Sequence, residues 1–317
     1  MGQRPIRAVV ALVVSGLLAA CSSSTGASST STTSSTSSTS STLPAGAVSI
    51  VKAPVLVAHT TDGVVGYRVV GAGPPLVLIM GYSGSMDAWQ PSFVDVLARA
   101  HRVVIFDNAG IGRTTALPAP LTISEMADQT AALIEALHLG RPDVLGWSMG
   151  GMIAQALAVL HPALVRRLVL CATLPGNGKA TAPSAAAARS LTHPSGNAIL
   201  GSLFPGNQHA AERAYVDGII EYPHFYLPDA AVDTLQLATL GPWLGGKTAA
   251  GRLIAAISAP TLVADGLDDF LVPAANDTEL HAVIHGSQLR LYPDAGHAFL
   301  FQDERQFVPA LERFLGN

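Results

Sequence analysis

Short apolar runs recur along most of the chain, and they predict the strands of one sheet. The first two, at 55–58 and 64–70, flank Asp62-Gly63, a pair that favours a hairpin turn. The later runs are nearly continuous in apolar residues, which is typical of parallel strands buried on both faces of a sheet. They lie at 76–80, 102–106, 143–147, 168–171, 260–264 and 288–292.

Stretches with helical periodicity separate these runs, at about 87–99, 123–138, 149–160, 274–285 and 303–315. Strands that alternate with helices after an antiparallel start predict an α/β fold, with an open, mostly parallel central sheet and helices on both faces. About 75 residues, 174–250, break the alternation with amphipathic segments and no clear strand. We predict a helical cap there, because pockets in such sheets form at the carboxyl ends of the strands.

The N-terminal segment differs from the rest of the chain and is expected to be an export signal. Residues 1–20 begin with basic side chains and contain a thirteen-residue apolar stretch, 8–20, too short to cross about 30 Å of hydrocarbon. The stretch ends in Leu-Ala-Ala followed by Cys21, which resembles the box where bacterial lipoprotein signals are cut and the cysteine is lipidated. An ordinary cleaved secretory signal is the alternative.

A low-complexity segment follows the signal. From Ser22 to Thr42, nineteen of twenty-one residues are Ser or Thr, so this segment cannot build a core. We expect 21–43 to be a lipidated cysteine with a disordered tether, and the folded domain to occupy 44–317. Two acyl chains on Cys21 would give stable anchoring, on the outer face of the bacterial cell membrane.

The amino-acid composition excludes several classes of protein. The 317 residues are 49% hydrophobic and 13% charged, with a net charge of -4, which fits neither a disordered chain nor a basic nucleic-acid binder. Two cysteines allow no disulfide framework. His281 and His285 could share a helix face, but the Glu that a zinc-binding H-E-x-x-H motif needs is Ala282. We expect no cofactor, no metal and no nucleic-acid partner.

A candidate nucleophile lies in Gly146-Trp147-Ser148-Met149-Gly150, which matches G-x-S-x-G. The motif follows a predicted strand and opens a predicted helix, which is the context it requires. Its glycines permit a tight, strained turn that exposes the Ser148 hydroxyl at a helix N-terminus. Trp147 adjoins the nucleophile and is a candidate for lining the pocket.

A hydroxyl needs a base, and the base needs an orienting acid. His297 follows the last predicted strand, and three carboxylates, Asp265, Asp268 and Asp269, follow the strand before it. The residues alone leave the choice among these carboxylates open. The chain order is nucleophile, acid, base.

These motifs resemble the α/β-hydrolase fold family, in its esterase, haloperoxidase-like and aminopeptidase-like branch. The resemblance covers the chain from about residue 55 to the end. It implies Asp269 as the acid, because that residue lies four before Pro273 in G-x-x-D-x-x-V-P. It also implies an oxyanion hole made by the backbone N–H groups of Tyr82 and Met149. Two departures are Met80, where relatives have His, and Ala109, where many have Arg.

The resemblance and the candidate triad together predict a membrane-anchored serine esterase that acts on a small or medium acyl substrate through an acyl-enzyme. Perhydrolysis, C–C bond hydrolysis and aminopeptidase chemistry on the same triad are alternatives. A non-catalytic surface module that binds a ligand is a further alternative, although all three triad positions are filled.

Overall fold

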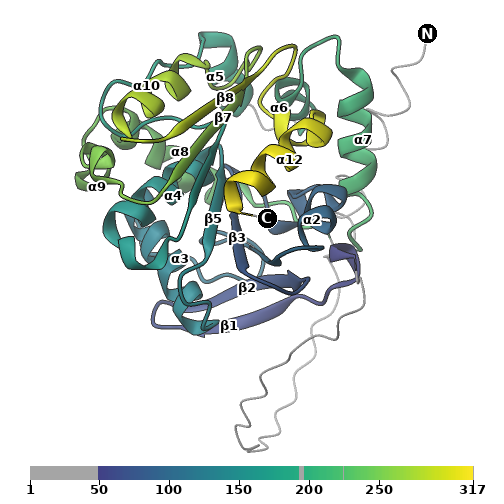
Figure 1. Ribbon diagram of the computed structural model, residues 1–317, viewed down its shortest axis with the longest axis vertical. Coiled ribbons are helices and arrows are strands. Elements are labelled where there is room, and N and C mark those ends of the chain that lie inside the picture. Colours follow the sequence, from purple (N-terminus) through teal and green to yellow (C-terminus); the bar gives the residue numbers. More distant parts are fainter. Residues whose placement is uncertain (1–48, 193–195, 224, 317) are drawn as a thin grey trace, which may run out of the picture.

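The computed structural model describes residues 49–192, 196–223 and 225–316 (Figure 1). The predicted signal, Cys21 and the tether lie outside the described residues, so export and lipidation stay predictions. Within these ranges no helix combines the length and the apolar character that crossing a bilayer requires.

An eight-stranded sheet forms the centre of the molecule, in the order β1-β2-β4-β3-β5-β6-β7-β8. The strands coincide with the eight predicted runs to within a few residues. Their bounds are β1 Leu56–Thr60, β2 Gly63–Val70, β3 Pro75–Ile79, β4 Arg102–Phe106, β5 Asp143–Trp147, β6 Leu168–Cys171, β7 Thr261–Gly266 and β8 Gln288–Tyr292.

The direction of the strands matches the predicted class. β1 pairs with β2, and β2 with β4, in antiparallel fashion, whereas every pair from β4 through β3 to β8 is parallel. The parallel strands therefore end at one edge, and the loops that leave those ends can meet. This arrangement is the predicted α/β fold, with the expected hairpin at its start.

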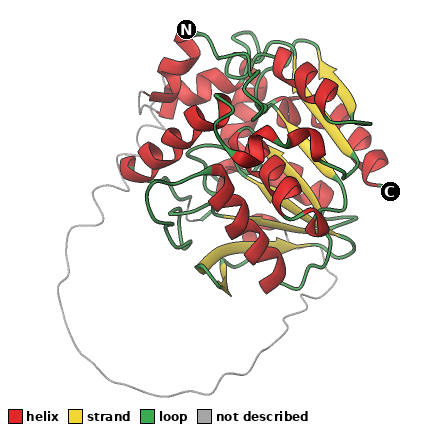
Figure 2. Cartoon of the chain, turned by 90° about the vertical axis from the view of Figure 1, so that its left-hand side faces the viewer, coloured by secondary structure: helices red, strands yellow, loops and turns green. Residues whose placement is uncertain are grey.

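Helices cover both faces of the sheet (Figures 1 and 2). α3 and α4 pack together on one face. α2 and α12 lie on the opposite face, where Phe93 and Phe307 stack with ring centroids 6.1 Å apart. Their bounds are α2 Pro91–Leu97, α3 Ile123–Ala136, α4 Met149–Leu160, α10 Ala275–Val283, α11 Phe299–Gln302 and α12 Glu304–Leu315, with short 3-10 turns η1 Ile50–Lys52, η2 Met86–Ala88, η3 Pro162–Leu164 and η4 Ile254–Ala256.

One predicted helix is divided. The pattern at 87–99 predicts a single helix, but the structure has η2 and then α2, with Gln90 extended at ψ 127° between them. The cause is Pro91, which disfavours the helical region for the residue before it and starts a new helix at its first position.

The inserted segment between β6 and β7 is helical, as its pattern predicts. It contains α5 Ala185–Thr192, α6 Gly196–Leu203, α7 His209–Ile219, α8 Ala230–Leu244 and α9 Ala249–Arg252. Two tyrosines, one in α7 and one just after it, hold this helix against the segment that follows β3. Tyr215 Oη donates to the Ala88 carbonyl and Tyr222 Oη donates to the Trp89 carbonyl, each at 2.9 Å. The inserted helices therefore pack against a loop that leaves the carboxyl end of a parallel strand.

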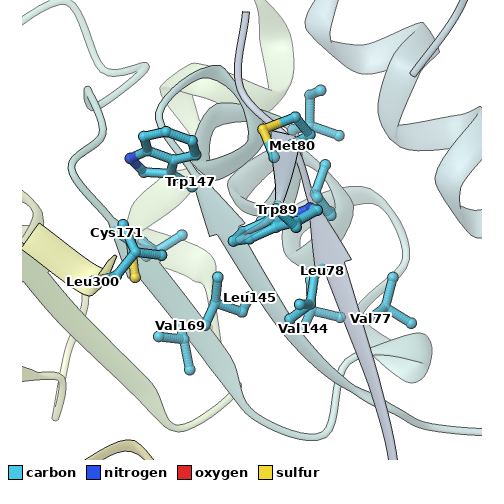
Figure 3. Close-up of a cluster of buried hydrophobic side chains, with 14 of the residues drawn as sticks. Val77, Leu78, Met80, Trp89, Val144, Leu145, Trp147, Val169, Cys171 and Leu300 are labelled. Carbon is cyan, nitrogen blue, oxygen red and sulfur yellow. The ribbon is translucent and has the colours of Figure 1, made fainter. Parts of the chain in front are cut away.

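The core fills the space between the sheet and the helices (Figure 3). β3, β5 and β6 bury almost every side chain, as their continuous apolar sequences require. Trp89 is fully buried and stacks against Phe93, which joins η2 and α2 to this core. The sheet is thus a rigid base for the loops at its carboxyl edge.

Candidate active site

Ser148 sits at the turn between β5 and α4, with a backbone conformation that non-glycine residues rarely adopt. Its φ is 58° and its ψ is -123°. Such strain persists only where the surroundings fix it. Here the Ser148 N–H donates to the Cys171 carbonyl at 2.9 Å, and the Ser148 carbonyl accepts from Thr173 Oγ1 at 2.7 Å.

Two glycines of the motif are required by close approach. A Cβ on Gly150 would lie 2.1 Å from the Ile79 carbonyl oxygen, and a Cβ on Gly146 would lie 2.3 Å from the Gly150 carbonyl oxygen. Backbone atoms cannot move away as a flexible side chain can. The glycines therefore let α4 start directly above the sheet, with Ser148 at its N-terminal end.

The structure brings the candidate base, His297, and the candidate acid, Asp269, together. His297 Nδ1 lies 2.6 Å from Asp269 Oδ2, and the two residues are 2% and 9% exposed. The other carboxylate oxygen accepts the N–H groups of Leu271 and Val272 at 2.7 and 2.8 Å. The carboxylate is thus held by its own loop, and it fixes the orientation of the imidazole.

The structure also separates the three candidate carboxylates. Asp268 is exposed, and Asp265 is fully buried with Oδ1 on the N–H of Gly266. Asp269 is the carboxylate that pairs with His297.

Trp147 connects the histidine to the strand that carries Ser148. Its Nε1 donates to the His297 carbonyl at 2.9 Å, and the two rings lie 5.5 Å apart between centroids. The indole is only 4% exposed, so it supports the histidine from within the core, and its place along a substrate pocket stays a prediction. Within the described residues no hydrogen bond joins the Ser148 hydroxyl to His297. Such bonds are often long or poorly aligned before a substrate binds.

The loop after β3 passes close to the candidate nucleophile, Ser148. A Cβ on Gly81 would lie 3.0 Å from Ser148 Cβ and 3.6 Å from Ser148 Oγ, so the loop backbone touches the serine. Among the described residues, the backbone hydrogen bonds outside regular elements include none donated by Tyr82 or Met149. Both N–H groups lie at the chain positions expected for oxyanion donors.

The segment that follows β4 supports this loop. Asn108 Nδ2 donates to the Met80 carbonyl at 2.8 Å, and Asp107 Oδ1 accepts from the Met86 N–H at 2.7 Å. Burial raises the pKa of Asp107 to about 6, against the opposing hydrogen bond from Met86. Met80, the position where relatives have His, is buried. Its carbonyl still accepts the Asn108 hydrogen bond, so the backbone of the loop is held despite the different side chain.

Comparison with known proteins assigns the chain to a family. Residues 74–304 match the profile of the alpha/beta hydrolase fold family. The chain belongs to this family. The predicted fold class is therefore confirmed, and so is the resemblance on which the expected hydrolase activity rests.

Relatives of the hydrolase carry several different names. RutD of Variovorax paradoxus, named as a carbamate hydrolase, is 30% identical over 260 residues, which cover 77% of this chain and 92% of RutD. A solved alpha/beta hydrolase fold protein of Chitinophaga pinensis has a TM-score of 0.74 at 25% identity, covering 85% of this chain and 100% of the other. BpoC of Mycobacterium tuberculosis, named as a non-heme bromoperoxidase, has a TM-score of 0.63 at 29% identity, covering 79% of this chain and 95% of the other.

The structure adds a buried carboxyl pair that sequence reasoning missed. Asp265 of β7 and Asp277 of α10 are both fully buried, and the two carboxyl groups interact electrostatically. Burial is the largest cause that raises the pKa of each well above the ordinary carboxyl value, and the charge of Asp269 adds to it. Asp277 gives no motif signal, because only the packing of α10 on the sheet brings it to Asp265.

Two further contacts of the hydrolase come from α8. Ser83, two residues after Gly81, donates its N–H to Gln236 Oε1 at 3.0 Å. The Tyr82 hydroxyl has its pKa raised to about 12, mainly by burial and then by the negative charge of Asp233. No sequence signal singles out Gln236 or Asp233, since both lie in a helix whose placement the pattern does not specify. Within the described ranges no group of three or more His, Cys, Asp or Glu side chains is arranged to hold a metal ion.

Proposed function

We propose that this α/β hydrolase is a serine esterase that cleaves a small or medium carboxylic ester through an acyl-enzyme. The observation that carries the proposal is the Asp269–His297 pair at 2.6 Å, together with a serine on a strained turn at a helix N-terminus. A buried carboxylate that orients an imidazole for a nearby serine hydroxyl is the arrangement that activates a serine nucleophile.

The proposed steps follow from these contacts. His297 Nε2 takes the Ser148 proton while the serine oxygen attacks the ester carbonyl, and the same nitrogen then returns the proton to the leaving alcohol. Asp269 holds the tautomer with the proton on Nδ1 and stabilises the imidazolium. Water then attacks the acyl-enzyme, with His297 as its base, and the acid is released.

The oxyanion of each tetrahedral intermediate is placed against the N–H groups of Tyr82 and Met149. The lack of other acceptors for these donors within the described residues supports this role. A donor of this kind contributes about 10²–10³ to the rate.

Cleavage of a carbamate is the second candidate. Its support is the relative from Variovorax paradoxus, which is named as a carbamate hydrolase. An ester and a carbamate present the same carbonyl to the serine, so the triad serves both. Perhydrolysis has weaker support, from the name of the Mycobacterium tuberculosis protein alone. Hydrolysis rates on matched ester and carbamate substrates, with and without peroxide, distinguish the three reactions.

The proposed nucleophile is tested by labelling with a fluorophosphonate. We expect the wild type to be labelled, Ser148→Ala to lose all labelling and the exposed Ser92→Ala to keep it. A folded wild type that takes up no label would instead favour a surface module that only binds a ligand.

We extend the proposal to the location of the enzyme, on the basis of the sequence alone. Cys21 receives the lipid after the signal is cut, and the Ser/Thr-rich tether holds the domain at the outer face of the bacterial cell membrane. Fractionation tests this: the wild type is expected in the membrane fraction and Cys21→Ser outside it. An equal distribution of the two proteins would contradict the anchor.

A further inference from the structure

α8 of the inserted segment reaches the loop beside the nucleophile through two side chains on consecutive turns. Gln236 Oε1 accepts the Ser83 N–H at 3.0 Å, and the Asp233 carboxyl lies close enough to the side chain of the same serine for that side chain to lower its pKa, against the larger effect of burial. Residues three apart share one face of a helix. Both side chains therefore converge on Ser83, whose φ of 57° is itself an uncommon conformation.

Each of these side chains keeps one polar atom without a partner. Gln236 is fully buried, and its Nε2 makes no hydrogen bond within the described residues. The buried Asp233 Oδ1 is likewise unpartnered in that part of the chain. A buried donor or acceptor without a partner is costly, so such atoms in a native structure point to a group that binds there.

The position of these atoms places them near the proposed chemistry. Ser83 is two residues from Gly81, whose backbone touches Ser148, and one residue from Tyr82, the proposed oxyanion donor. Tyr82 also faces the inserted helices, since its hydroxyl lies 3.5 Å from the Leu191 carbonyl. α8 therefore lies against the loop that carries the proposed oxyanion donor.

We propose that Gln236 and Asp233 form a polar subsite that binds a neutral substrate group able both to accept and to donate a hydrogen bond. Gln236 Nε2 donates to the oxygen of that group, and Asp233 Oδ1 accepts its N–H or O–H. A carboxamide and a hydroxyl both have this chemistry. An alkyl group leaves both protein atoms unpaired, and a carboxylate meets the negative charge of Asp233. The inference rests on the proposed function and specifies the substrate class of that site.

The test is a set of methyl esters with acyl chains of matched length that end in a carboxamide, a hydroxyl, an isopropyl group or a carboxylate. Isopropyl has nearly the shape of a carboxamide, so the ratio of kcat/KM for these two esters isolates hydrogen bonding. We expect the wild type to prefer the carboxamide or the hydroxyl to isopropyl by at least about tenfold.

Two variants test whether Gln236 and Asp233 cause the preference for the polar esters. Gln236→Glu keeps an oxygen for the Ser83 N–H and removes the donor, and Asp233→Asn removes the charged acceptor. Each is expected to lower the ratio about tenfold. Ala238→Glu adds a charge on the exposed side of α8 and leaves the ratio unchanged. If the role of Gln236 is only to hold the loop, both esters slow equally and the ratio stays constant, which would overturn the proposal.

The failure of this inference differs from the failure of the proposed function. A wild type that hydrolyses the isopropyl ester as fast as the polar ones, or prefers the carboxylate, contradicts the subsite and leaves the esterase intact. A wild type that hydrolyses none of the esters and takes up no fluorophosphonate contradicts both.

Discussion

Single residues of the site are set by a few short contacts. Asp269 gives one oxygen to His297 and the other to two backbone N–H groups of its own loop, so its carboxylate cannot rotate freely. Its neighbour Asp268 is exposed. One position along the chain thus separates a carboxylate that bonds the imidazole from a solvated carboxylate.

Asp269→Asn tests the acid. The amide oxygen can still accept the loop N–H groups, but the charge that stabilises the imidazolium is lost and the tautomer is no longer enforced. We expect kcat to fall by about 10⁴ with little change in thermal stability, as measured by ester hydrolysis and by thermal unfolding. Asp268→Asn removes the same charge one residue earlier and is expected to change kcat less than about twofold. The reverse pattern would assign the acid to Asp268.

At the scale of elements, the site depends on how closely α4 approaches the sheet. The Gly150 position lies against the Ile79 backbone of β3, and Gly151 lies against Thr173 after β6, where a Cβ would come within 2.6 Å of the side chain. The turn that carries Ser148 is therefore fixed by the packing of one helix on three strands, and not by its own sequence alone.

Gly150→Ala is expected to break this packing. The added Cβ would meet the Ile79 carbonyl at 2.1 Å, so either α4 or β3 must move. We expect a loss of about 3 kcal/mol or more in the free energy of unfolding, measured with denaturant, together with loss of activity. Gly241→Ala in α8 is the matched control, because a Cβ there meets nothing within 4 Å. It is expected to stabilise by about 0.5–1 kcal/mol. Equal effects of the two substitutions would contradict the close approach.

At the scale of the whole molecule, buried carboxyl groups make stability depend on pH. Asp265, Asp277 and Asp107 all have raised pKa values, caused first by burial. The charge of Asp269, on the loop after β7, faces the pair, and the buried neutral thiol of Cys171 in β6 lies near Asp277, whose charge contributes, after burial, to the raised pKa of that thiol. The folded protein thus keeps protons that the unfolded chain releases. This contribution to stability is complete below the ordinary carboxyl pKa and is lost as pH rises toward the raised values.

Asp277→Asn is expected to reduce the loss of stability that accompanies a rise in pH. The amide can donate to the Asp265 carboxylate, so the variant gains stability relative to the wild type as pH increases from 5 to 8. We expect a relative gain of about 1 kcal/mol or more, seen as an increase in Tm of about 2 °C. Asp268→Asn, which removes an exposed charge, should show the same Tm difference from wild type at both pH values. If Asp277→Asn increases stability more at pH 5 than at pH 8, the predicted direction of the pH dependence is wrong.

The sequence alone determined the strands and most helices, and it supplied the candidates for the nucleophile and the base. These properties are local: apolar runs specify buried strands, and a glycine-flanked serine between strand and helix specifies a tight turn. The division of the predicted helix at Pro91 could also have been predicted from the sequence, because proline constrains the residue before it.

Tertiary structure decided which distant groups meet. The burial of Asp277 against Asp265 and the contact of Gln236 with Ser83 join segments that lie 12 and 153 residues apart. No local pattern encodes such contacts, because they depend on strand order and on where the inserted helices pack. The chain sequence therefore specifies the chemistry available at the site, and the packing of α8 and α10 specifies the surroundings in which that chemistry operates.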